Sequence, residues 1–444
     1  MRALLVSTYD LGRQPFGLAS PAAWLRAAGI EVTCADASRT QVDDDALASA
    51  EVVGLYLPMH TATRLAMPLI ERARRVNPAL RLCAFGLYAP LNEHVLRESG
   101  VDAVFGGEFE EALTGWILAT DEGHRAPDKS GIARLQFKVP DRSGLPPLNR
   151  YAALQGPDGA RRLVGYTEAS RGCKHLCRHC PIVPVYEGRF RVVRPEVVIE
   201  DVRAQVNEGA QHITFGDPDF FNGIGHARAI VQAFADAFPG VTYDVTIKVE
   251  HLLKHRDVLP LLAQTGCLFV TSAVESVDDA VLARLQKGHT RADFEAALLA
   301  CRHAGVALAP TFLPFTPWTT LDGYIELLTA IAALDLVDQV ASIQLAIRLL
   351  VPNGSRLLEV EEVRRAIGPF DPRALVYPWN HVEPAVDALQ LAVERIVRTN
   401  VNASRPEVFA SVWDAAHGAA GVNRAAPVLP SRTTIPFLTE PWYC

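Results

Sequence analysis

The sequence predicts an α/β protein in three parts: an N-terminal doubly wound, Rossmann-like domain, a partial (β/α)6 barrel, and an irregular, partly helical C-terminal region. Two series of short β-branched runs alternate with amphipathic helical stretches, a pattern typical of βαβ units with a parallel sheet. A segment rich in Pro, Gly and Asp separates the two series. A tight group of three cysteines follows the first strand of the second series and marks a candidate site.

The first series occupies residues 1–120. Apolar runs predict five strands at RALLVS, EVTCAD, EVVGLYL, LRLCAFG and DAVFGG, with helical patterns such as SPAAWLRAAG and TRLAMPLIERARRV between them. In a doubly wound sheet the ligand crevice lies at the carboxyl ends of the strands, here near Tyr9, His60 and residues 85–88. Residues 121–161 lack sustained periodicity and predict a linker between the two series.

The second series occupies residues 162–351. Strands are predicted at LVGYTEA, HITFG, YDVTIKV, LFVTSAVES, ALAPTFLP and SIQLAIR, each followed or preceded by a helical pattern. Six units are fewer than the eight of a complete barrel, so we expect an incompletely closed barrel whose site faces the carboxyl ends of its strands. Residues 352–444, with helical patterns around EVEEVRRAI, AVDALQLAVERIVRTN and PEVFASVWDAAHG, are expected to cover the mouth of the barrel.

Composition narrows the class of protein. The 444 residues are 49% hydrophobic and 21% charged, which is typical of an ordinary globular chain. The net charge of −7, without a long run of one sign, argues against nucleic acid as a partner. The sequence contains neither a signal-peptide pattern nor an apolar run of the ~18–20 residues that span a bilayer. We therefore expect a cytoplasmic protein with no membrane partner, in which cysteines serve metal binding or catalysis rather than disulfides.

The three neighbouring cysteines form a C-x3-C-x2-C triplet at Cys173, Cys177 and Cys180. Three thiolates can occupy three irons of a [4Fe-4S] cube and leave the fourth iron open to a substrate or cofactor. The alternative is a Cys3His zinc site completed by His175 or His179. Structural zinc usually takes two separated pairs of ligands that organise a small fold, so one loop in a large domain favours the cluster. The other internal cysteines are expected to be buried apolar residues: Cys34, Cys83, Cys267 and Cys301.

With this triplet after the first barrel strand, the sequence resembles the radical S-adenosylmethionine (SAM) enzymes. The resemblance implies a [4Fe-4S] cluster that binds SAM through its open iron, and a flavodoxin- or ferredoxin-like electron donor. It also implies SAM-binding groups at the strand ends: acceptors of the methionyl amine after the second strand, groups near the carboxylate or ribose after the third and fourth, and a ring near the adenine. A plain turn is the alternative for residues 216–220. The implied cofactor-binding residues are His179, Gly216, Asp217, Asp219, Lys248, Glu250, Glu275, Ser276 and Arg348.

A closer resemblance, to the CUAEP/CCAEP-tail radical SAM proteins, extends over stretches such as RGCKHLCRHCPIVPVYEGRFRVV, HITFGDPDFFNG and VTIKVEHLLKHRD. That family is named for a C-terminal Cys-Sec or Cys-Cys pair followed by Ala-Glu-Pro. Because this chain stops at Cys444, we expect a selenocysteine codon interpreted as a stop, with a genuine end as the alternative. Cys444 is accordingly a candidate substrate or redox thiol.

The N-terminal domain resembles the cobalamin-binding-type domain that precedes many radical SAM barrels. The Asp-x-His-x-x-Gly loop that supplies an axial histidine is missing from the sequence, and neither His60 nor His94 has that context. Cobalamin is therefore a candidate cofactor without a protein axial ligand, and a domain that has lost the cofactor is the alternative.

These observations predict a radical SAM enzyme, most simply a transferase, that modifies a small-molecule substrate by methyl, alkyl or hydrogen-abstraction chemistry. Two alternatives remain: transfer of a 3-amino-3-carboxypropyl group from SAM to arsenic, and a non-catalytic zinc protein. Fold alone does not fix the substrate. Polar candidates near the barrel mouth are Tyr186, Arg189, Arg191, His251, His289, Thr316, Gln344 and Arg348.

Overall fold

The N-terminal unit is built on a five-stranded parallel sheet. A computed structural model of the chain describes residues 1–119, 135–156, 159–422, 424–427 and 437–439. The strand order is β2-β1-β3-β4-β5, which is a doubly wound order whose switch point lies between β1 and β3. The strands are β1 (Arg2–Ser7), β2 (Glu31–Asp36), β3 (Val52–Tyr56), β4 (Arg81–Phe85) and β5 (Ala103–Phe105).

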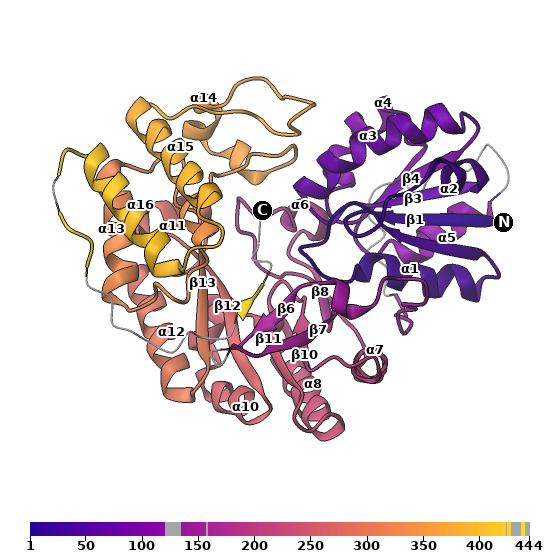
Figure 1. The fold of residues 1–444 in the computed structure, drawn as a ribbon, viewed down its shortest axis with the longest axis horizontal. Coiled ribbons are helices and arrows are strands. Elements are labelled where there is room, and N and C mark those ends of the chain that lie inside the picture. Colours follow the sequence, from indigo (N-terminus) through magenta and orange to yellow (C-terminus); the bar gives the residue numbers. More distant parts are fainter. Residues whose placement is uncertain (120–134, 157–158, 423, 428–436, 440–444) are drawn as a thin grey trace.

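Helices cover both faces of this sheet (Figure 1). Successive strand residues face opposite sides, so that Leu5 of β1 packs in one core and Leu4 in the other. The first core contains Leu18 and Leu113, and the second contains Ile70. The helices are α1 (Phe16–Ala27), α2 (Asp44–Ser49), α3 (His60–Val76), α4 (Glu93–Glu98) and α5 (Glu110–Leu118).

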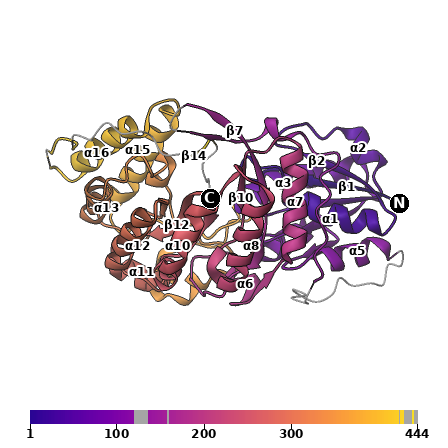
Figure 2. The same ribbon diagram turned by 90° about the horizontal axis from the view of Figure 1, so that it is seen from below.

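The second unit is a curled seven-stranded sheet in the order β13-β12-β11-β10-β7-β6-β14. Five neighbouring strands run parallel, and β6 and β14 add an antiparallel edge. Its helices lie outside the curve (Figures 1 and 2), as expected for a partial barrel. The strands are β6 (Ala153–Gln155), β7 (Arg161–Thr167), β10 (His212–Phe215), β11 (Thr242–Thr246), β12 (Cys267–Glu275), β13 (Ala307–Phe312) and β14 (Phe437–Leu438).

The outer layer of the partial barrel contains one main helix after most parallel strands. These helices share a single large core with the sheet, in which Val202, Phe234 and Leu298 are fully buried. The helices of this unit are α7 (Pro195–Asn207), α8 (Ile224–Ala237), α9 (Val249–Lys254), α10 (Leu259–Gln264), α11 (Asp279–Leu285), α12 (Arg291–Ala304) and α13 (Leu321–Ala333).

The predicted sixth parallel strand, SIQLAIR, does not form. Its first half is the 3-10 turn η5 (Ser342–Leu345), and only an isolated bridge between Phe315 and Arg348 continues the sheet. The physical reason lies in Gln344, whose side-chain oxygen accepts a hydrogen bond from the backbone N–H of Phe312 at 3.0 Å. The side-chain amide of Gln344 thus occupies the backbone N–H at the edge of β13 to which a sixth strand would have bonded.

Arg142 joins the two units from the segment between them. Its guanidinium donates to the carboxylate of Asp201 in α7 at 2.8 and 2.9 Å, to the side chain of Gln14 at 2.8 Å, and to the carbonyl of Tyr166 in β7 at 2.6 Å. Since Arg142 and Asp201 are both buried, this contact fixes the N-terminal unit against the barrel.

The C-terminal region continues the outer helical layer. Helices α15 (Pro384–Thr399) and α16 (Arg405–Ala419) pack with α13 in the barrel core, and they lie beside it in Figure 1. The preceding segment, with η6 (Arg356–Glu359) and α14 (Glu361–Ala366), contacts the cysteine loop instead, where Arg356 donates to the carbonyl of Leu176 at 2.8 Å. Cys444 and residues 120–134 lie outside the described residues. Among the described helices, none has the length and apolar character to cross a bilayer.

Candidate active site

The cysteine triplet lies in a loop held by a short hairpin at the end of β7. Strand β8 (Ser170–Gly172) pairs antiparallel with β9 (Phe190–Val192), and the cysteines follow directly. Gly172 has φ +74°, and a Cβ there would lie 2.4 Å from the Tyr186 ring and 2.5 Å from the carbonyl of Arg189. Only glycine fits this position, so the sequence RGC fixes the direction in which the cysteine loop leaves the sheet.

The three thiols lie close enough for their charges to interact, and Cys177 is buried while Cys173 and Cys180 are partly buried. Burial is the main cause that raises the pKa of Cys173 to about 11 and that of Cys180 to about 12, and the charge of Cys177 contributes to both rises. Such thiols deprotonate when a cation binds them, because metal binding stabilises the thiolate. The donor set therefore suits an iron–sulfur cluster: three soft ligands in one loop, shielded from water. All seven cysteines among the described residues are free of disulfides.

A buried lysine lies beside two of these thiols. Lys287 Nζ is 3.3 Å from a carboxylate oxygen of Glu275, which also lies 3.0 Å from Nε2 of His179. Burial lowers the pKa of Lys287, but Glu275 and then the charges of Cys177 and Cys180 raise it above its ordinary value. Burial also raises the pKa of Glu275, yet Lys287 and His179 outweigh this effect and bring it to about 2. A fixed cation therefore faces the cysteine loop.

Sequence reasoning placed Glu275 and His179 in the site and missed Lys287. The available signal was the stretch KGHTRADF, which begins with Lys287. In the structure Lys287 stands between Gln286 and Gly288, two residues with positive φ. Such a turn directs a side chain back from the end of α11 toward the sheet.

Asp217 supports the start of the cysteine loop. Its two carboxylate oxygens accept hydrogen bonds from the backbone N–H of Ala169 at 2.9 Å and the hydroxyl of Ser170 at 2.5 Å. Burial raises its pKa to about 7, although these bonds oppose the rise. Gly216 lies under the Tyr166 ring, where a Cβ would be 1.7 Å from the phenol oxygen. Ser276 accepts a bond from the N–H of Asp278 at 3.0 Å, at the turn that follows β12.

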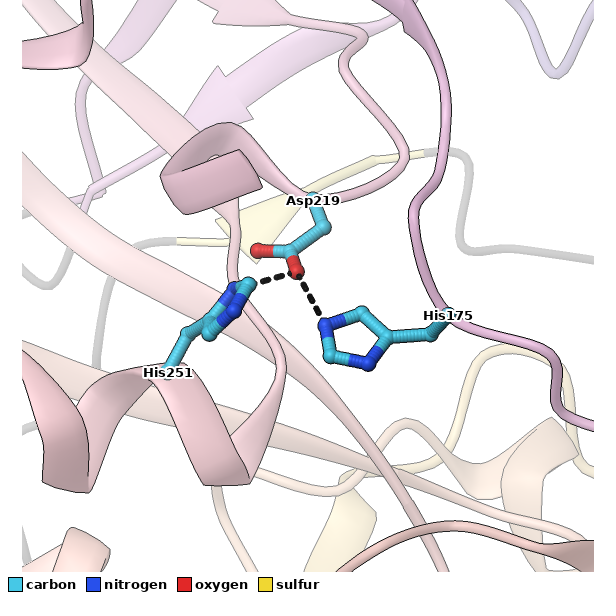
Figure 3. A group of neighbouring side chains, drawn as sticks. All are labelled: His175, Asp219 and His251. Atoms are coloured by element: carbon cyan, nitrogen blue, oxygen red, sulfur yellow. Dashed lines mark ion pairs between the residues drawn. The ribbon is translucent and has the colours of Figure 1, made fainter. Parts of the chain in front are cut away.

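Asp219, Lys248 and Glu250 meet on the other side of the loop. Lys248 Nζ lies 3.1 Å from Nδ1 of His175 and 3.3 Å from Glu250. Asp219 lies against the imidazoles of His175 and His251 (Figure 3). Burial raises the pKa of Asp219, but the two imidazoles lower it to about 2, so the carboxylate is ionised.

Arg348 lies apart from these groups. It pairs with Asp387 at 2.7 Å and lies over the Trp379 ring at 3.6 Å, so that it ties the C-terminal region to the barrel. Most other predicted mouth residues contact protein groups as well: Tyr186 donates to Glu108, Arg189 pairs with Glu187, Arg191 donates to the carbonyl of Phe190, His289 contacts the carbonyl of Val274, and Thr316 bonds with Thr319.

Comparison with known proteins identifies the class of protein. Residues 167–328 match the model of the radical SAM superfamily, and this range contains all three cysteines of the triplet. The chain therefore contains a radical SAM domain, and such a domain implies a [4Fe-4S] cluster and SAM.

Particular relatives share parts of the chain. A tRNA-2-methylthio-N(6)-dimethylallyladenosine synthase of Desulfosudis oleivorans is 29% identical over 251 residues, which cover 54% of this chain and 49% of that protein. The chain thus spans about half the length of this curated relative. Two solved structures have the same fold. The cobalamin-dependent radical SAM enzyme OxsB gives a TM-score of 0.71 at 15% identity, with 90% of this chain and 67% of that chain covered. The radical SAM methyltransferase TsrM of Kitasatospora setae gives 0.61 at 18% identity, with coverages of 75% and 71%.

Proposed function

We propose that Cys173, Cys177 and Cys180 hold a [4Fe-4S] cluster with which the enzyme cleaves SAM and transfers a SAM-derived group to a small molecule. The observation that carries this proposal is the proximity of three thiols, one buried and two partly buried, in one loop of the radical SAM domain. When bound and reduced by a flavodoxin- or ferredoxin-like donor, the cluster supplies the electron that breaks a sulfonium C–S bond of SAM.

The chain's own residues are proposed to bind and orient the cluster and SAM. In this proposal the Lys287 ammonium offsets the negative charge of the ligated thiolates, and Glu275 holds Lys287 and His179 in place. Asp217 fixes the backbone at the entrance to the cysteine loop. His179 in the cysteine loop and residues after or at the ends of β10, β11 and β12 are proposed to contact SAM: Gly216, Asp217, Asp219, Lys248, Glu250, Glu275 and Ser276.

The activities named for two similar proteins favour transfer chemistry. The names of the curated relative and of TsrM describe a methylthio-adding synthase and a methyltransferase. Transfer of an aminocarboxypropyl group to arsenic was expected from a thiol at Cys444, which lies outside the described residues. This transfer is therefore one of the two outcomes that the product analysis distinguishes. A non-catalytic zinc protein is disfavoured, because the matched domain is a radical SAM domain.

Cobalamin is proposed only as a candidate second cofactor. The strand order of the N-terminal sheet and the cobalamin-containing structures of OxsB and TsrM support it. His60, however, faces the carbonyl of Ala374 at 2.7 Å and is not offered as an axial ligand. Tyr56, at the end of β3, fills the space beside α1, where a Cβ on Gly17 would lie 2.1 Å from its ring. We therefore derive no step through cobalamin.

The test is analysis of SAM products by mass spectrometry after anaerobic reconstitution with iron and sulfide and addition of a strong reductant, with and without cobalamin. We expect either 5′-deoxyadenosine or 5′-methylthioadenosine, and the second product would make arsenite the first acceptor to try. Cys177→Ala is expected to lose bound iron and both products, whereas Cys34→Ala, at a buried position of β2, keeps them. A Cys177→Ala protein with full iron and product would overturn the proposal.

A further inference from the structure

We propose that His175, Asp219 and His251 form a binding site for one divalent transition-metal ion, separate from the ligands of the iron–sulfur cluster. Figure 3 shows both imidazole rings directed at one carboxylate. Its three residues include no cysteine of the triplet, so the site does not depend on the ligands of the cluster, and in it Asp219 binds the ion in place of its proposed contact with SAM.

Three segments far apart in the sequence supply the three ligand atoms. His175 lies within the cysteine loop, Asp219 precedes the 3-10 turn η3 (Phe220–Gly223), and His251 belongs to α9. Oδ2 of Asp219 lies 2.6 Å from Nδ1 of His251 and 3.4 Å from Nε2 of His175. One potential ligand atom of each residue lies within 4.8 Å of those of the other two. Metal bonds of ~2.0–2.2 Å place neighbouring tetrahedral ligands about 3.3–3.5 Å apart, so small ring movements complete the set.

The atoms that face one another are buried and lack well-formed hydrogen bonds. The side chains of Asp219 and His251 are 2% and 1% exposed, and that of His175 is 13% exposed. Within the described part of the chain, Asp219 Oδ2, His175 Nε2 and His251 Nδ1 have no hydrogen-bond partner of satisfactory geometry. These three atoms thus meet one another only in ion-pair contacts at 2.6 and 3.4 Å, and a single cation would give all of them one common partner.

The surroundings hold the carboxylate in this orientation. Oδ1 of Asp219 accepts weak hydrogen bonds from the backbone N–H groups of Phe221 at 3.3 Å and Lys248 at 3.5 Å, which leaves Oδ2 directed at the imidazoles. Nδ1 of His175 lies 3.1 Å from Lys248 Nζ and 3.6 Å from a Glu250 oxygen, and a small rotation of the ring toward Glu250 would give the outer carboxylate contact that orients a metal-bound histidine. The nearby Lys248 ammonium is paired with Glu250 at 3.3 Å, so its charge is offset.

The donor set selects the class of ion. Two imidazole nitrogens and one carboxylate oxygen suit Zn²⁺, Fe²⁺ or Co²⁺, whereas Mg²⁺ and Ca²⁺ prefer all-oxygen sites and Cu⁺ prefers sulfur. Three protein ligands leave at least one coordination position open. An ion here would tie the cysteine loop to α9 through His175 and His251.

The first test uses Co²⁺ as the probe on the full-length Cys173→Ala, Cys177→Ala, Cys180→Ala chain. We expect one equivalent of Co²⁺ with visible d–d bands and no thiolate-to-cobalt charge-transfer band. Adding Asp219→Asn or His251→Gln is expected to weaken binding at least tenfold. His255→Gln is the matched control, since His255 follows α9 and its ring lies 5.8 Å from that of His251 without belonging to the set.

A second measurement covers the case in which the triple variant does not fold. The cysteine-intact chain, reconstituted with iron and sulfide and then dialysed against Zn²⁺, is expected to hold one zinc per chain beside its iron. Asp219→Asn is expected to lose the zinc and keep the iron. Equal zinc in Asp219→Asn and the unmodified chain, or a folded triple variant that binds no Co²⁺, would overturn the proposal and leave Asp219 as an anion that only orients two rings.

Discussion

The guanidinium of Arg171 lies 2.7 Å from the carboxylate of Glu110, and this buried ion pair connects the β8–β9 hairpin to the N-terminal unit. Arg171 is in β8, two residues before Cys173, whereas Glu110 is the first residue of α5 in the N-terminal unit. Glu168 and Glu108 approach the same guanidinium at 2.7 and 3.5 Å. The position of the cysteine loop therefore depends on a charge contact with the N-terminal unit.

Removing this cation is expected to destabilise the protein strongly. Arg171→Met leaves three carboxylates in a buried site without their cation, which costs about 3–5 kcal/mol of unfolding free energy. Thermal unfolding of the reconstituted protein and its iron content provide the measurement. The control is Arg189→Met, whose half-exposed partner pair with Glu187 is worth about 1 kcal/mol or less. Equal losses in the two variants would contradict the prediction.

Stability is expected to fall between about pH 4.5 and pH 7 through Glu108. Burial raises its pKa from 4.5 to about 7, so the folded protein holds this proton more tightly than the unfolded chain. The resulting stabilisation is complete below the unfolded pKa and is lost as the pH rises through about 7. Glu108→Gln, which cannot ionise, should reduce the fall in unfolding free energy between about pH 5 and pH 8 by about 1–3 kcal/mol. Identical pH profiles for variant and unmodified protein would refute this role.

Lys287 is expected to raise the reduction potential of the bound cluster. Its ammonium faces Cys177 and Cys180, and a nearby cation stabilises the more negative, reduced state. Lys287→Met should therefore make the midpoint potential more negative by on the order of 50 mV. A redox titration followed by electron paramagnetic resonance measures the change without recourse to turnover.

The contribution of Glu275 is separated from that of Lys287 by a double variant. Lys287→Met with Glu275→Gln removes the ion pair without leaving a buried carboxylate unpaired. If the charges of Lys287 and Glu275 act on the cluster in opposition, we expect the double variant to have the midpoint potential of the unmodified protein. An unchanged potential in Lys287→Met would show that its charge does not reach the cluster.

Gly172→Ala is expected to disturb the cysteine loop more than an ordinary glycine substitution. The new Cβ would clash with Tyr186 and the carbonyl of Arg189, and φ is +74°. We expect a loss above about 2 kcal/mol and reduced iron retention. Gly240→Ala is the control, because its φ is +84° but nothing lies within 4 Å of the added Cβ. The control should cost about 1 kcal/mol and keep its iron.

The sequence predicted those features that depend on local pattern. Alternating strands and helices predicted both sheets, and three cysteines in eight residues predicted the ligand loop, because each signal lies within a short stretch. The prediction of a sixth strand was wrong, since the side chain of Gln344, and not the backbone of a further strand, bonds to β13. Lys287 and the contact of Asp219 with His175 and His251 were missed, because they depend on long-range packing that no spacing in the sequence records.

The antiparallel pairing of β14 with β6 brings the first and last described strands of the barrel unit together at one edge of its open sheet. Residues 153–155 and 437–438 lie on neighbouring strands, so the chain enters and leaves this unit at the same edge of the sheet. A unit whose two ends meet can be inserted into another protein or rejoined in a new order without stretching its backbone. The radical SAM unit of this chain thus has the geometry of a unit that can be transferred between proteins.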